Sequence, residues 1–246
     1  ASVSATDADE PANPLTYSLV NGPSGLTVSP TGGILWTPTE DQGPGTNLVT
    51  IRVTDTNAAA LTANSLSVTS SFEVVVGEVN VAPVLGALTN RSVNPGQIVG
   101  FTATATDPDV PANGISYSLL NPPSGADITP TGIFSWRPGV ALADTTNVIQ
   151  VRVQDTGTPA LSDTNSFSVV VAPLAPVVLE AQAFTNGQFT LKASGLVGPD
   201  YVLQAATEFS NWLNLSTNTP AAVPFELTDP GAGQFSNRFY RLRLQP

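Results

Sequence analysis

Alternation of apolar and polar residues is the dominant pattern along this chain, and it predicts strands rather than helices. In residues 49–53, valine or isoleucine occupies every second position, with Thr50 and Arg52 between them, and residues 149–153 follow the same pattern. A period of two is typical of a strand that buries one face. Asn-Gly, Pro-Ser-Gly and Pro-Thr-Gly motifs separate such segments as turns. The pattern therefore predicts an all-β chain.

The whole pattern occurs twice. Residues 1–61 align with residues 101–161 without a gap, at a constant offset of 100 positions. A short insertion in the first copy then precedes its last strand, 72–76, which matches 167–171. The matched pairs include Asp7/Asp107, Asp9/Asp109, Asn13/Asn113, Tyr17/Tyr117, Gly32/Gly132 and Trp36/Trp136. About seven short strands in each copy of roughly 95 residues indicate tandem β-sandwiches.

The beginnings of the two copies differ. An opening strand region, residues 84–100, precedes Phe101, whereas the counterpart of Phe101 in the first copy is Ala1. We therefore expect the first sandwich to lack an edge strand, which favours association. Two explanations stand: the sequence is a segment of a longer repeat array, or another chain supplies the strand. Trp36 and Trp136 are expected to fill the two cores.

Residues 174–246 do not match the repeat and predict a third, smaller β-sandwich near the lower size limit for a domain. We expect domains at 1–80, 81–173 and 174–246, with Pro246 as the C-terminus. Strands are predicted at 177–184, 188–193, 201–206, 212–216, 223–228 and 238–244.

The amino-acid composition excludes several classes of function. The net charge is −11 with one lysine and seven arginines, so there is no basic patch for nucleic acid. Without histidine or cysteine, the chain has no disulfide, no His or Cys zinc ligand, and no Ser-His-Asp or Cys-His nucleophile. No apolar run is long enough to span a bilayer. A two-carboxylate glycosidase stays formally open, but the acids cluster in turns, and we predict that the protein is not an enzyme.

Oxygen donors gather around the start of the second copy. Asp107, Asp109 and Asn113 follow a hinge at residues 78–83. Without nitrogen or sulfur ligands, any metal must be a hard cation, calcium before magnesium. The alternative is that these residues only form turns, since Asp and Asn bond their own backbone there.

The motif order resembles that of a known repeat family. Ala-Thr-Asp-x-Asp, Tyr-Ser-Leu, Thr-Gly-x-x-x-Trp, Arg-Val-x-Asp-Thr and Phe-x-Val-Val-Val follow one another in both copies. This order resembles the cadherin-like repeats of bacterial surface proteins, in the dystroglycan-type cadherin and "putative Ig" group, over residues 1 to 172. The resemblance implies Ca²⁺ between consecutive repeats. The implied ligands are Glu40, Asp41, Glu78, Asn80, Asp107, Asp109, Asn113 and Asp155.

The outer end of the first copy and the end of the second copy are expected to differ from the predicted Ca²⁺ site between the copies. At the outer end of the first copy, Asp7, Asp9, Asn13 and Asp55 form a similar donor set without an upper partner. After the second copy, Arg137 stands in the segment that holds acids in the first, and residues 172–176 are apolar and Pro-rich, so we predict a stiff hinge without a cation.

The C-terminal unit resembles terminal modules of large secreted bacterial proteins, on motifs such as Gly195-Leu196 and Asn211-Trp212. That resemblance implies surface attachment or sorting. Tyr201, Phe209 and Trp212 could form a sugar-stacking platform, but core packing is favoured.

Together these observations predict a non-catalytic extracellular protein at the cell surface, a structural or adhesive stalk or filament. We expect Ca²⁺ to rigidify it, and polymerisation by strand donation is one of the two explanations open for the first copy. The expected partners are other copies, upstream domains of the same chain or surface polysaccharide, with no nucleic acid. The alternative is a set of carbohydrate-binding or spacer modules at the C-terminus of a larger secreted hydrolase.

Overall fold

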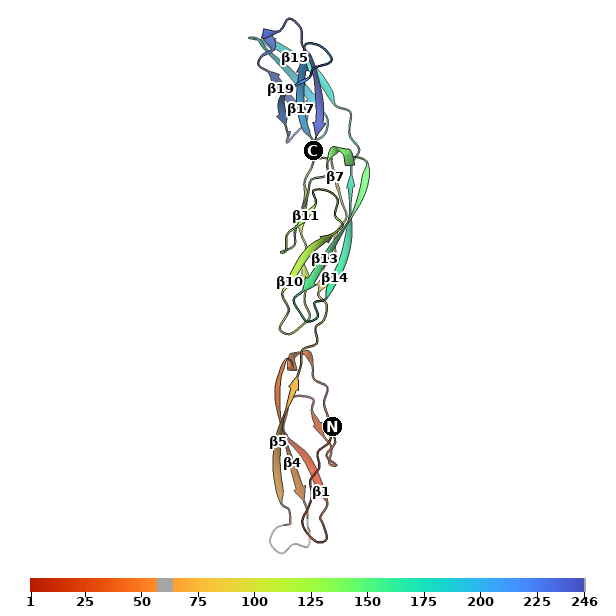
Figure 1. The fold of residues 1–246 in the computed structure, drawn as a ribbon, viewed down its shortest axis with the longest axis vertical. Helices are drawn as coiled ribbons and strands as arrows, with labels where there is room; N and C mark the ends of the chain where they lie inside the picture. Colours follow the sequence, from red (N-terminus) through yellow and green to blue (C-terminus); the bar gives the residue numbers. More distant parts are fainter. Residues whose placement is uncertain (57–63, 246) are drawn as a thin grey trace. The chain divides into compact units, whose positions relative to one another are not determined.

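The computed structural model describes residues 1–56 and 64–245 (Figure 1). These residues form β-strands and three single-turn 3₁₀ helices, so the predicted all-β fold class is confirmed. None of the described helices has the length and apolar character needed to cross a membrane. The chain divides into two compact units: residues 1–81 with 109–113, and residues 82–108 with 114–246.

The first copy lies in the first unit. Its larger sheet has the order β1-β4-β5, and a second sheet pairs β2 with β3. Leu26, Val49 and Ile51 form its buried core, against which Tyr17 and Trp36 pack. The element bounds are β1 Leu15–Asn21, β2 Thr27–Val28, β3 Ile34–Leu35, η1 Glu40–Gln42, β4 Gly45–Asp55 and β5 Ser67–Val76.

The second copy lies in the second unit and has more strands. One sheet has the order β10-β13-β14-β7, another has β11-β12-β8, and β6 pairs with β9. Its core is larger and includes Phe134, Trp136 and Phe167. The bounds are β6 Val84–Leu85, β7 Arg91–Val93, β8 Val99–Thr102, β9 Ala105–Thr106, β10 Ile115–Leu120, β11 Asp127–Ile128, β12 Ile133–Trp136, η2 Val140–Leu142, β13 Thr145–Asp155 and β14 Ser162–Val171.

The registers of the two copies agree. Tyr17 lies opposite Val53 in the first copy, as Tyr117 lies opposite Val153 in the second. The tryptophan ring nitrogens donate equivalent hydrogen bonds, from Trp36 to the Ser24 carbonyl and from Trp136 to the Ser124 carbonyl, each of 3.1 Å. Equal registers and equal side-chain bonds are what a duplicated domain predicts, but only Trp136 is fully buried, whereas Trp36 is half-buried.

The C-terminal module is a pair of three-stranded sheets, with orders β15-β16-β19 and β18-β17-β20 (Figure 1). Its core holds Leu191, Ala193, Leu203 and Leu227. The six strands lie within two residues of the predicted bounds: β15 Val178–Thr185, β16 Gln188–Ser194, β17 Asp200–Ala206, β18 Leu213–Asn218, β19 Phe225–Asp229 and β20 Phe239–Gln245, with η3 at Ala232–Gln234.

Candidate cation site

Three carboxylates converge in the first unit. Glu40, Glu78 and Asp109 each present a carboxylate oxygen, and these oxygens lie within 4.8 Å of one another. Glu40 opens η1, Glu78 follows β5, and Asp109 belongs to the loop 109–113, which packs as part of this unit. Three sequence segments therefore meet at one point through groups of the same charge.

The residues around η1 fix the position of Glu40. The backbone N–H of Thr39 donates to Gln42 Oε1 at 2.9 Å, which completes a capping box around η1. Such a box fixes the first turn of a helix by satisfying backbone donors that would otherwise have no partner. Asp41 lies beside Glu40 in the same turn, but its carboxylate accepts a hydrogen bond from the Thr39 hydroxyl and does not join the cluster.

Asn113, itself bonded to Asn80, holds the buried member of the cluster. Asp109 is 3% exposed and accepts hydrogen bonds from the Val81 backbone N–H at 3.1 and 3.3 Å. Asn113 Nδ2 donates to Asp109 Oδ2 at 2.6 Å and to Asn80 Oδ1 at 2.8 Å. The loop therefore closes on itself, and Asp109 is held in a defined orientation. Five of the eight predicted ligands, Glu40, Glu78, Asn80, Asp109 and Asn113, lie in this connected set.

Of the three remaining predicted ligands, Asp41 lies beside the cluster in the first unit, and Asp107 and Asp155 lie in the second unit. Asp107 follows β9 and is half-buried. Asp155 ends β13, is 4% exposed, and accepts hydrogen bonds from the backbone N–H groups of Gly157 and Leu161 at 3.0 and 2.9 Å. The bonds of Asp155 are those of a turn-forming aspartate. The ligand roles of both residues stay predictions.

A second carboxylate cluster lies in the first copy and shares one contact with the first cluster. Oxygens of Asp7, Asp9 and Asp55 lie within 4.8 Å of one another beside a cavity of about 320 Å³. Asn13 Nδ2 donates to Asp9 Oδ2 at 2.8 Å, which repeats the contact between Asn113 and Asp109. The predicted donors Asp7, Asp9, Asn13 and Asp55 therefore lie close together.

The donor set of the first cluster suits a hard cation. Carboxylate and amide oxygens are the ligands that Ca²⁺ takes, in groups of six to eight. Glu40 and Glu78 are exposed and can adjust their side chains, whereas Asp109 is fixed. Without a cation, three like charges at this spacing repel one another.

The second copy and the C-terminal module are joined by a contact that no sequence motif predicts. The guanidinium of Arg137 forms two bonds with Asp200: Nη2 to Oδ1 at 2.8 Å and Nη1 to Oδ2 at 3.1 Å. Arg137 also donates to the carbonyl of Gly96 at 2.6 Å and to that of Gly198 at 3.0 Å. A signal was present, because Arg137 occupies the position of Thr37 in a chain with few cations.

Charge and backbone geometry reinforce that contact. The hydrogen bonds from Arg137 lower the pKa of Asp200, and they raise the pKa of Arg137 above its ordinary value. Gly96 and Gly198 have φ values of 76° and 131°. A Cβ on Gly198 would lie 2.6 Å from the Pro95 carbonyl oxygen. The two backbone segments therefore approach too closely for any side chain at this position.

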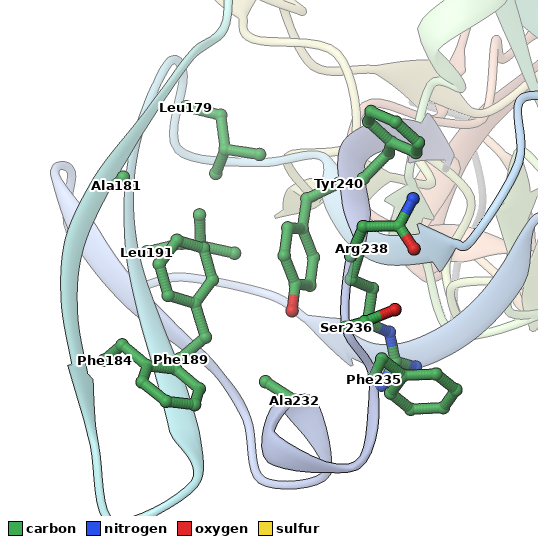
Figure 2. A pocket seen from close by; sticks show the side chains of 12 residues that line it. Leu179, Ala181, Phe184, Phe189, Leu191, Ala232, Phe235, Ser236, Arg238 and Tyr240 are labelled. Atoms are coloured by element: carbon green, nitrogen blue, oxygen red, sulfur yellow. The ribbon is translucent and has the colours of Figure 1, made fainter.

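The C-terminal module contains an open cavity of about 600 Å³ (Figure 2). Figure 2 shows apolar side chains of β15 and β16, among them Leu179 and Leu191, across the cavity from Tyr240. The Tyr240 hydroxyl donates to Asp229 Oδ2 at 2.8 Å, and Arg238 pairs with the same oxygen at 3.0 Å. Burial, together with the bond to Asp229, raises the pKa of Tyr240 to about 12.

The three residues considered as a sugar platform do not lie on one surface. Tyr201 is fully buried, and its hydroxyl bonds the Leu196 backbone, which confirms the core interpretation for this residue. Phe209 is 72% exposed, and the guanidinium of Arg241 lies 4.2 Å from the ring centre of Trp212.

Comparison with known proteins supports the predicted repeat type. A family model described as "Putative Ig domain" matches residues 1–77, which confirms the Ig-like character of the first copy. A comparison with curated proteins gives no match.

Several solved structures are similar to the chain. Human CDH23 EC21-23 is 18% identical, with 79% of this chain and 77% of that chain covered and a TM-score of 0.48. Mouse Cadherin-23 EC22-24 is 14% identical, with coverage of 99% and 89% and a TM-score of 0.48. Protocadherin Gamma B2 extracellular cadherin domains 3-6 are 23% identical, with coverage of 70% and 47% and a TM-score of 0.43. The chain thus spans about half the length of this protocadherin fragment.

Proposed function

We propose that this chain is a non-catalytic structural or adhesive segment of an extracellular protein, and that Ca²⁺ binds among Glu40, Glu78 and Asp109. The observation that carries the proposal is the convergence of these three carboxylates from separate segments. Mutual repulsion makes such a cluster unfavourable unless a cation or protons offset the charge. The Ig-like match of residues 1–77 supports a structural module.

The mechanism is a change in stiffness. Bound Ca²⁺ supplies positive charge that offsets the repulsion among the carboxylates. Asn113 and the Val81 backbone N–H already orient Asp109, so part of the ordering cost of binding is met by the folded chain. Loop 109–113 connects β9 to β10 of the second copy in the sequence, so a cation that holds Asp109 beside Glu40 and Glu78 ties this loop to residues of the first copy. Cation binding therefore favours a stiffer stalk.

Calcium is expected rather than magnesium. Ca²⁺ accepts a large and irregular set of oxygen ligands, whereas Mg²⁺ requires near-ideal octahedral geometry and keeps several waters. The cluster joins flexible exposed glutamates to one fixed aspartate, which suits the less demanding ion. The proposed partners are further copies of the chain or adjoining repeats of the same protein.

The test measures thermal unfolding of the whole chain, first in a chelator and then at increasing Ca²⁺ concentrations. A ligand that binds only the folded state stabilises it by about 2.7 kcal/mol at one hundred times its Kd. We expect the unfolding temperature to rise with Ca²⁺ and to reach a plateau. The double substitution Glu40→Gln with Glu78→Gln should lower the calcium affinity strongly.

The matched control is Asp41→Asn. It removes one carboxylate next to Glu40 but outside the cluster. This variant should keep the calcium response of the unsubstituted chain. An unfolding temperature that does not change with Ca²⁺ would contradict the proposal. Equal losses of calcium affinity in the double variant and in Asp41→Asn would also contradict it.

A further inference from the structure

Three aromatic rings gather beside the sheet β18-β17-β20 of the C-terminal module. Phe209 and Trp212 lie in the loop between β17 and β18, and Phe239 opens β20. The ring centres of Phe209 and Phe239 are 4.2 Å apart, and those of Phe209 and Trp212 are 6.5 Å apart. Phe209 is 72% exposed, whereas the other two are half-buried. We call these three rings the aromatic platform; it contains Phe239 in place of the buried Tyr201.

A guanidinium is held beside the aromatic platform. The guanidinium carbon of Arg241 lies 4.2 Å from the ring centre of Trp212, and Arg241 Nε donates to Gln204 Oε1 at 2.8 Å. Gln204 is 5% exposed and lies opposite Arg241 on β20 and Asn214 on β18. Stacking on a ring and a bond to a buried amide orient the guanidinium before any ligand arrives. The cost of ordering it on binding is therefore reduced.

The hydrogen bonds in this row of side chains run in one direction. Arg241 donates to Gln204, and Gln204 Nε2 donates to Asn214 Oδ1 at 2.6 Å. Both amide oxygens thus act as acceptors within the row. The terminal nitrogens of Arg241 and Nδ2 of Asn214 have no acceptor among the described residues, and both side chains are exposed. The row therefore presents N–H donors and suits a ligand rich in oxygen acceptors.

The charge on this face is positive. Arg241 and Arg243 are two positions apart on β20, so they lie on the same face of the strand. The ion pairs among the described residues use two other arginines. Glu208, in the loop beside the platform, accepts a hydrogen bond from an asparagine of that loop. Residues 174–246 contain five acidic and four basic residues, whereas residues 1–173 contain fourteen and four. Charge complementarity therefore favours an anion at this face.

Rings and donors together fit a sugar that carries a carboxylate. The faces of aromatic rings are electron-rich and attract the C–H groups on the flat side of a sugar ring. A guanidinium binds a carboxylate through two parallel hydrogen bonds. An acidic peptide would use the arginines but not the exposed ring of Phe209, and a neutral sugar would use the ring but not the charge. An acidic saccharide uses both.

We propose that the aromatic platform, together with Arg241 and Arg243, binds an acidic polysaccharide. One sugar ring stacks on Phe209, and a carboxylate of the polysaccharide pairs with Arg241. This inference gives the proposed adhesive role a partner and rests on that role only for its setting. The binding itself does not require Ca²⁺.

The test measures binding of an oligogalacturonate, a short chain of carboxylated sugars, to the whole chain by calorimetry in a chelator. We expect saturable binding. The fully methyl-esterified oligomer keeps the sugar rings without the charge, and hexaglutamate keeps the charge without the rings. Each should bind about tenfold more weakly, the effect of losing one good charged or stacking contact. Equal binding of the methyl ester, or equal binding of hexaglutamate as expected for an acidic peptide site, overturns the proposal.

Substitutions locate the site. Phe209→Ala and Arg241→Gln should each weaken oligogalacturonate binding about tenfold. Arg241→Lys should recover little, because lysine lacks the planar fork. Phe184→Ala is the matched control for the first, since Phe184 is 60% exposed on the other sheet of the module. Lys192→Gln is the matched control for the second, because it removes one exposed positive charge from the same module. Both controls should bind like the unsubstituted chain.

Two further results would overturn the proposal. One is that the unsubstituted chain fails to bind the oligogalacturonate, and the other is that the controls lose as much affinity as the platform variants. Phe209 and Arg241 are exposed, so the fold should tolerate their replacement. The unfolding temperature of each variant, measured first, separates loss of the site from loss of the fold. Since Ca²⁺ is absent throughout, failure here leaves the cation proposal to its own test.

Discussion

Arg137 and Asp200 form a two-point ion pair, although 63 positions separate them in the sequence. Arg137 lies just after β12 in the second copy, and Asp200 opens β17 in the C-terminal module. Two parallel bonds give this pair a fixed direction as well as charge. The pair is partly buried, with side-chain exposures of 32% and 16%, so solvent screens it only in part.

Replacing Arg137 tests how much this pair contributes. Arg137→Ala should lower the free energy of unfolding of the C-terminal module by about 1 to 3 kcal/mol, since hydrogen bonds to charged groups contribute that much. Arg137→Lys should recover little, because lysine lacks the planar fork. Denaturant unfolding followed by Trp212 fluorescence measures both. Lys192→Ala removes an exposed positive charge as a control, and a loss equal to that of Arg137→Ala would contradict the prediction.

The ionisation of Asp200 should make the stability of the fold depend on pH. Its pKa is lowered, chiefly by the hydrogen bonds from Arg137. The pair therefore contributes fully above the ordinary aspartate pKa of about 3.9, and the contribution is lost as pH falls through the lower folded value. Acid unfolding of Asp200→Asn should show a weaker pH dependence below about pH 4 than the unsubstituted chain. Identical acid profiles would show that Asp200 is not coupled to folding.

Gly198 tests the close approach of the two backbones. Gly198→Ala should destabilise the contact by about 1 to 3 kcal/mol, because the new Cβ meets the Pro95 carbonyl in a backbone conformation that L-residues rarely adopt. Gly45→Ala is the control, since a Cβ at Gly45 meets no atom within 4 Å. Thermal unfolding of both variants gives the comparison. A Gly198→Ala chain as stable as the control would contradict the geometry.

The Tyr240 hydroxyl should ionise at a higher pH than an ordinary tyrosine. Burial and the carboxylate of Asp229 raise its pKa to about 12. A raised folded pKa means that the stabilisation is complete below the ordinary tyrosine value of about 10, and is lost as pH rises towards the folded value. The difference in tyrosinate absorbance between the unsubstituted chain and Tyr240→Phe should therefore develop near pH 12. A difference centred near pH 10 would contradict the buried environment.

The paired phenylalanines test the difference between the copies. Phe167→Ala should cost about 3 to 5 kcal/mol, the usual range for a buried phenylalanine. Phe72→Ala should cost clearly less, because Phe72 is already 37% exposed. Unfolding of the two single variants measures both costs within one protein. Equal costs would mean that the edge of the first copy is as well covered as that of the second.

Much of the fold was predictable because the chain repeats itself. Alternation in residues 49–53 and 149–153 marked the central strands β4 and β13, and the offset between copies identified the absent edge strand. The six strands of the C-terminal module followed from alternation and turn residues. Trp36 is the weaker case: the sequence indicates a core residue, but its side chain is half-buried.

The sites were harder to predict for a physical reason. Asp109 and Asn113 are four positions apart, so their contact is local and a motif can indicate it. Glu40, Glu78 and Asp109 meet only because loop 109–113 packs with residues of the first copy, and their grouping came from a family resemblance. Arg137 and Asp200 have no such motif. Their contact depends on how two modules pack, which residue types in a linker do not reveal.

The parallel pairing of β7 with β14 has a mechanical consequence. These strands stand near the beginning and the end of the second copy, so tension applied at residues 82 and 172 loads their hydrogen bonds in shear. Bonds under shear bear load together, whereas bonds at an open hairpin end break one after another. Under traction, separating the two ends of the second copy therefore requires the β7–β14 bonds to give way together.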